Sequence, residues 1–149
     1  MKFYITGSTR GLGKYLCNEF NCIRVDRPFD ISKDISKIVD QIESDSVVIL
    51  NAHADGTQIR YIEKLKDRCR LVIMGSIASV NQDPNMVEYS KQKEHLEKLV
   101  TQLALNNDYP MLYLRLTSSS YKNYSMIAES IKFWLNNPDV TFIGYNINE

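Results

Sequence analysis

Thr6-Gly7-Ser8-Thr9-Arg10-Gly11-Leu12-Gly13 is the stretch that decides the fold of this chain. It follows the apolar run Phe3-Tyr4-Ile5 and precedes apolar residues at helical spacing, so its glycines fall at a predicted strand-to-helix turn. Backbone N–H groups at a helix start bind phosphate, and glycine lets a diphosphate approach them because it has no Cβ. The sequence therefore predicts a phosphate-binding turn made of Gly7, Ser8, Thr9, Arg10, Gly11, Leu12 and Gly13.

Three further landmarks follow this turn along the chain. Asn51-Ala52-His53-Ala54 comes directly after the apolar run Val47–Leu50, at the predicted carboxyl end of a strand, where open α/β sheets bind ligands. Tyr89-Ser90-Lys91-Gln92-Lys93 places a tyrosine and a lysine four residues apart, so both lie on one face of a helix. Ser76 lies thirteen residues before Tyr89 and follows another apolar run.

The glycine spacing T-G-x-x-x-G-x-G, the Asn51 stretch, Ser76 and the Y-x-x-x-K pair resemble, in this order, the motifs of the short-chain dehydrogenase/reductase family. The resemblance runs along nearly the whole chain, with loops and one βα unit of the family trimmed away. It implies a Rossmann-type, doubly wound parallel sheet of about six strands with helices on both faces. The alternation of strand and helix patterns agrees with this α/β class, and we expect a single domain over residues 1–149.

The apolar periodicity also predicts where the individual elements lie. We expect strands near residues 2–6, 22–26, 47–50, 71–74, 111–116 and 140–143. We expect helices over 11–20, over 36–43 with Ser36 as N-cap, over 59–69, from Tyr89 to about Asn106, and over 127–135.

The family resemblance implies a chemical role for three residues. Tyrosine, with a pKa near 10, is a poor base at neutral pH, and a lysine ammonium one turn away stabilises its phenolate. Tyr89 is therefore expected to be the acid/base, Lys93 to assist it and bind the nicotinamide ribose, and Ser76 to polarise the substrate oxygen. The family also places a catalytic asparagine on the helix between Thr57 and Arg70, where this chain has none, so we do not expect an asparagine relay.

The cofactor implied by the resemblance is NAD or NADP. Asp26, thirteen residues beyond Gly13, is placed to accept hydrogen bonds from the adenosine ribose and to repel a 2′-phosphate, which favours NAD. Arg10 and Arg27 favour NADP, and we rank NAD first. The resemblance further implies that cofactor contacts come from Asp30, Ile31, Asn51, Ala52, His53, Tyr89, Lys93 and Thr117, with Ser118 as an alternative to Thr117.

These residues point to an NAD(P)-dependent oxidoreductase that interconverts a carbonyl and an alcohol on a small molecule. A second hypothesis is a non-catalytic NAD(P)-binding regulator or subunit, because only Thr117–Lys122 stands where the family has a long substrate loop. A third is a sugar-nucleotide reductase or epimerase, because the link between Asp26 and Asp30 is compact.

The composition excludes several other classes of protein. The 149 residues carry a formal net charge of zero, which predicts no nucleic-acid or membrane partner. Three cysteines without metal-ligand spacing predict reduced thiols in a cytoplasmic protein. His53 and Asp55 are too few to predict a metal site. The trimmed loops and the family resemblance lead us to expect a homo-oligomer, a dimer or tetramer.

Overall fold

The protein folds around a six-stranded, all-parallel sheet, as described by a computed structural model for residues 1–25, 28–52, 56–80 and 84–145. The strands lie in the order β2-β1-β3-β4-β5-β6. They span β1 (Phe3–Thr6), β2 (Ile23–Arg24), β3 (Val47–Leu50), β4 (Arg70–Ser76), β5 (Met111–Leu116) and β6 (Phe142–Gly144). The predicted α/β class and strand number are confirmed.

The strand order reverses at β1, and this reversal positions the site. The chain first moves from β1 to β2 at one edge, and then returns to β3 on the other side of β1 and continues to β6. Thr6 pairs in register with Leu50, so the glycine turn after β1 and Asn51 after β3 begin side by side. Such a reversal opens a crevice at the carboxyl ends of the strands, because the connecting helices diverge to opposite faces.

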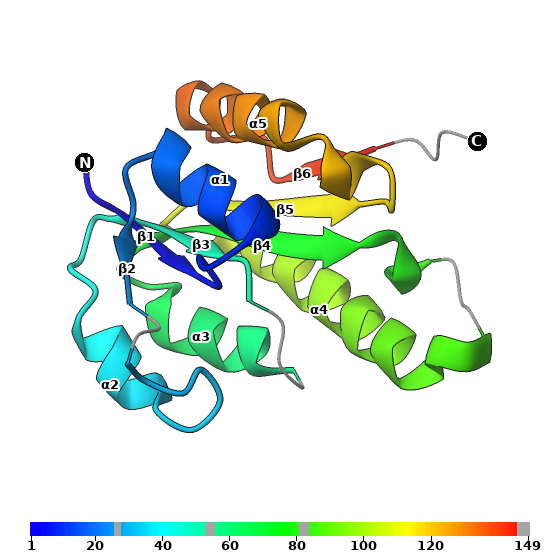
Figure 1. The fold of residues 1–149 in the computed structure, drawn as a ribbon, viewed down its shortest axis with the longest axis horizontal. Coiled ribbons are helices and arrows are strands. Elements are labelled where there is room, and N and C mark those ends of the chain that lie inside the picture. Colours follow the sequence, from blue (N-terminus) through cyan, green and yellow to red (C-terminus); the bar gives the residue numbers. More distant parts are fainter. Residues whose placement is uncertain (26–27, 53–55, 81–83, 146–149) are drawn as a thin grey trace.

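Helices cover both faces of the sheet, and the strands are apolar because both faces are buried. Figure 1 shows α1 and α5 on one face and α3 and α4 on the other. The helices span α1 (Gly11–Glu19), α2 (Ile35–Asp40), α3 (Thr57–Leu65), α4 (Val87–Asn106) and α5 (Tyr124–Asn136). Successive strand residues alternate between two cores: Val48 and Leu50 pack with α2, α3 and α4, whereas Val47 and Ile49 pack with α1 and α5.

Three predicted boundaries were wrong. The second strand pairs over two residues rather than five. The first short helix after it begins at Ile35, so Ser36 lies inside α2 and is not its N-cap. Helix α3 ends at Leu65, and Cys69 is buried in the turn that leads to β4.

Only α2 joins β2 to β3 among the described residues of that connection. β2 is the edge strand of the sheet on this side of β1. No helix formed by the described residues is long and apolar enough to cross a bilayer.

Candidate functional site

The turn after β1 is built on close backbone contacts that leave no room for side chains. Gly7 has a φ of +73°, in the left-handed region that favours glycine. A Cβ on Gly13 would overlap the carbonyl oxygen of Gly7 and lie 2.6 Å from Nδ2 of Asn51. The Asn51 amide donates a hydrogen bond of 2.8 Å to that same carbonyl of Gly7. The start of α1, the turn and the end of β3 are thus held together.

The residues of this turn differ in burial: some pack into the core, and others face solvent at the start of α1. Leu12 and Ser8 are fully buried, and Leu12 belongs to the core. Thr9, Arg10 and Gly11 are exposed at the start of α1. Arg10 precedes the helix in an extended conformation, and its side chain makes no capping hydrogen bond. The free N–H groups of the first turn are therefore available to an anion.

The end of β3 brings two predicted residues to the same crevice. The N–H of Ala52 donates a hydrogen bond of 3.2 Å to the Thr6 hydroxyl, and Asn51 is fixed by its bond to Gly7. Both are half-buried. His53, Asp26 and Arg27 lie outside the described residues, and so does Asp55.

Ser76 ends β4 and turns the chain into a short 3₁₀ helix, Ile77–Ser79. Its Oγ accepts a hydrogen bond of 3.1 Å from the N–H of Ala78. Its carbonyl oxygen accepts one of 2.9 Å from the Ser79 hydroxyl. This bond uses one lone pair of Oγ, so the Ser76 hydroxyl can still donate its hydrogen to a ligand.

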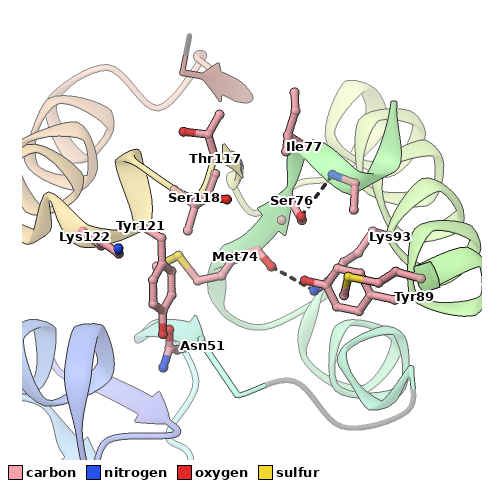
Figure 2. A pocket seen from close by; sticks show the side chains of 14 residues that line it. Asn51, Met74, Ser76, Ile77, Tyr89, Lys93, Thr117, Ser118, Tyr121 and Lys122 are labelled. Atoms are coloured by element: carbon pink, nitrogen blue, oxygen red, sulfur yellow. Dashed lines mark hydrogen bonds between the residues drawn. The ribbon is translucent and has the colours of Figure 1, made fainter. Parts of the chain in front are cut away.

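Tyr89 and Lys93 lie one turn apart near the start of α4. The Lys93 Nζ lies 5.7 Å from the centroid of the Tyr89 ring. The Lys93 side chain is buried, with 3% of its surface exposed, and burial lowers its pKa to about 8. Its Nζ donates hydrogen bonds to Oε1 of Gln58, at 2.8 Å, and to the Met74 carbonyl, at 3.4 Å. The Met74 bond is drawn in Figure 2.

A cavity of about 730 Å³ lies at the carboxyl ends of the strands, and these groups line it. Figure 2 shows side chains from the ends of β3, β4, β5 and the start of α4 around it. The lining includes five predicted site residues: Asn51, Ser76, Tyr89, Lys93 and Thr117. The proposed acid/base, its lysine and the serine thus share one pocket.

Thr117 is held by a tight turn after β5. Its Oγ1 accepts a hydrogen bond of 3.0 Å from the Ser120 N–H, and its own N–H donates to the Ser120 hydroxyl at 2.6 Å. Thr117 is buried, whereas Ser118 is exposed, and both line the cavity. The turn therefore holds Thr117 in the lining of the cavity without a long loop.

Asp30 and Ile31 are not brought into this cavity. Asp30 accepts hydrogen bonds from the Ser32 N–H and hydroxyl and from the Lys33 N–H, which hold the pKa of its carboxyl below the usual range. The Ile31 carbonyl accepts a bond of 2.7 Å from the Tyr61 hydroxyl. Both residues form a turn before α2, and their contact with adenine stays a prediction.

Several residues reach the site from outside the motifs that the sequence shows. Gln58 touches Lys93, and Met74, Met86, Tyr121 and Lys122 line the cavity. Gln58 lies on α3, the helix where the family resemblance implies an asparagine, so an amide on this helix is the signal that the sequence offers. Tyr121 and Lys122 lie in the short segment before α5, which shows no motif.

No protein-family model matches the chain, and no curated protein matches it. Solved structures do match. A short-chain dehydrogenase/reductase from Vibrio parahaemolyticus is 15% identical, with a TM-score of 0.74 over 98% of this chain and 100% of that one. A small-chain dehydrogenase is 12% identical, with a TM-score of 0.79 over 97% and 96%. An NADH-dependent reductase complexed with NAD is 12% identical, with a TM-score of 0.74 over 97% and 94%. Over nearly its whole length, this chain therefore has the fold of the short-chain dehydrogenase/reductases.

Proposed function

We propose that this protein is an NAD(P)-dependent oxidoreductase that interconverts a carbonyl and an alcohol on a small molecule. The observation that carries the proposal is the convergence of Ser76, Tyr89 and Lys93 on one cavity beside the glycine turn. A binding role alone does not require an acid/base pair in the pocket. The names of the similar structures, one of which was complexed with NAD, support the same class of reaction.

The residues of the glycine turn fit a dinucleotide. Because Gly13 lies close to Gly7 and neither residue has a Cβ, no side chain of theirs covers the N–H groups at the start of α1. These N–H groups would hold the diphosphate. The buried hydroxyl of Ser8 has no hydrogen-bond partner among the described residues and is a further donor at this turn. Asn51, Thr117 and Lys93 would hold the nicotinamide end, because all three line the cavity.

The chain's own residues would then move the proton. Bound NAD(P)H supplies the hydride that reaches the carbonyl carbon. The Tyr89 phenol donates its proton to the carbonyl oxygen, and the Ser76 hydroxyl donates a hydrogen bond that holds that oxygen in place. The Lys93 ammonium, close to the Tyr89 ring, stabilises the phenolate that remains. In the oxidation of an alcohol, the same proton returns to Tyr89.

The proposal is tested by exchanging the phenol of Tyr89 for a phenyl ring. Oxidation of NADH and NADPH is followed by absorbance against a panel of aldehydes and ketones. We expect the wild-type protein to turn over at least one of them, and Tyr89→Phe to lower kcat by about 10²–10⁴-fold with cofactor affinity nearly unchanged. Running both cofactors also tests the preference for NAD that Asp26 predicts.

Tyr109→Phe is the matched control, because its hydroxyl bonds Asp45 at 2.8 Å and does not line the cavity. This variant should keep wild-type kcat. An undiminished kcat in Tyr89→Phe would refute the assignment. Tight cofactor binding without turnover of any carbonyl would instead favour the non-catalytic regulator or subunit.

A further inference from the structure

Gln58 joins the carboxyl ends of two strands to the lysine of the site. It is the second residue of α3, and its side chain is buried, with 4% of its surface exposed. Its Nε2 donates hydrogen bonds to the Leu50 carbonyl, at 3.1 Å, and to the Met74 carbonyl, at 3.2 Å. Its Oε1 accepts the hydrogen bond of 2.8 Å from the Lys93 Nζ.

These three bonds fix which way the amide faces. Rotating the amide by half a turn would direct its oxygen at two carbonyl oxygens and its NH₂ at an ammonium, which places like partial charges together. The main chain at the ends of β3 and β4 therefore sets the Gln58 oxygen toward Lys93. A buried ammonium needs such an acceptor, because burial alone favours its neutral form.

We propose that Gln58 is the positioning residue for Lys93: it holds the ammonium beside Tyr89 and keeps it charged. This inference rests on the proposed function for its catalytic meaning. It assigns to a glutamine side chain the place on this helix where the family resemblance led us to look for an asparagine. Gln58 does not itself line the cavity, so it acts through Lys93 and does not touch the substrate.

The groups that face Lys93 simplify the test. Of the described residues that line the cavity, the other titratable ones are Tyr89 from α4, and Tyr121 and Lys122 from the segment before α5. None of these described lining residues is a carboxylate, and the acceptors that Nζ contacts are the neutral amide oxygen of Gln58 and the Met74 carbonyl. Removing Gln58 should therefore change the titration of Lys93 directly.

The experiment measures the Lys93 titration by NMR of protein carrying ¹³Cε-labelled lysine, with the signal assigned by its absence in Lys93→Met. In the wild type we expect a midpoint near pH 8. Gln58→Met, which loses the acceptor, should move the midpoint about one unit lower. Gln58→Glu, which keeps an acceptor and adds a charge, should move it higher. The basic limb of the pH–kcat profile should follow both shifts.

Asn107→Met is the matched control. The Asn107 amide also donates to two main-chain carbonyls, those of Lys66 and Tyr109, at 2.7 and 2.6 Å, but it lies at the other end of α4. Its loss should lower stability without moving the Lys93 midpoint. Should Gln58→Met fail to fold, Gln58→Glu decides alone through its upward shift.

A Lys93 midpoint in the Gln58 variants equal to that of the wild type would overturn the proposal. The NMR titration needs no turnover, so the two proposals fail separately. A shifted midpoint in a protein without carbonyl reduction would sink the proposed function and leave the role of Gln58 standing.

Discussion

At the scale of single residues, Gly13 is the glycine at which an added Cβ would come closest to another atom. A Cβ there would meet the carbonyl of Gly7, which belongs to the main chain and cannot rotate away. We expect Gly13→Ala to lower the free energy of unfolding by at least about 2 kcal/mol, or to open the turn and abolish cofactor binding. Urea denaturation and titration with NADH fluorescence measure the two outcomes.

Gly144→Ala is the control for this substitution. Its Cβ would approach the edge of the Phe142 ring at 3.2 Å, and this side chain can move. The cost should be well below that of Gly13→Ala. Equal costs at both positions would contradict the close contact that we assign to the glycine turn.

The residues of the site were predictable to different degrees. Ser76, Tyr89 and Lys93 were found because their spacing resembles a known motif, and the structure brings them to one cavity. Gln58 was not found, because its contact with Lys93 spans 35 residues of chain and depends on how α3 docks against β4. Apart from an amide on the expected helix, a contact of this range leaves no local pattern in the sequence.

At the scale of elements, α4 is tied to β5 by an ion pair just beyond Lys93. Arg115 donates to both carboxylate oxygens of Glu97, at 2.8 and 2.9 Å, and its guanidinium lies 4.8 Å from the Phe142 ring centroid. The pair is largely shielded, with the Glu97 side chain 13% exposed. We expect Glu97→Gln to lower the free energy of unfolding by about 1–3 kcal/mol, measured in urea.

The same helix offers the control. Glu94 bonds Lys98 at 2.9 Å on the surface of α4, with the lysine side chain 70% exposed. Glu94→Gln should change stability by at most about 0.5 kcal/mol, because water and salt screen an exposed pair. A larger loss from Glu94→Gln than from Glu97→Gln would contradict this account of how α4 is anchored.

Elements with a complete apolar pattern were predicted well, and short ones were not. The runs Val47–Leu50 and Met111–Leu116 are strands as predicted, since each is buried on both faces. The second strand was overestimated, because Ile23 and Arg24 are exposed and pair along one edge only. The cap of α2 was misplaced, because Asp34 rather than Ser36 precedes the helix and accepts the Asp30 N–H at 2.9 Å.

At the scale of the whole molecule, Lys93 links stability to pH. Its pKa is lowered from 10.5 to about 8 in the folded state, so between these values the unfolded chain binds the extra proton. The contribution of Lys93 to stability therefore rises as pH increases from about 8 to 10.5. The whole rise is about 3 kcal/mol, because it removes the penalty of burying the charged form of Lys93.

The measurement compares wild type with Lys93→Met in urea at several pH values. Burial raises the pKa of Cys22 to about 12 and also raises that of Tyr113. The contribution of these two groups to the free energy of unfolding therefore falls as pH rises. They occur in both proteins and cancel in the difference. The stability of the wild type relative to Lys93→Met should climb through this window, and a flat difference would show that Lys93 keeps an ordinary pKa.

The two outermost strands of the sheet have a consequence for how the molecule behaves in crowded solution. β2 pairs over two residues and β6 over three, whereas β4 extends over seven. The outer side of an edge strand carries unpaired main-chain N–H and C=O groups, with which a strand of another molecule can pair. Short edge strands with charged side chains pair poorly in this way. Arg24, exposed on β2, adds such a charge. The longest and most apolar strands thus lie inside the sheet, and we expect the protein to resist growth into fibrils by strand addition.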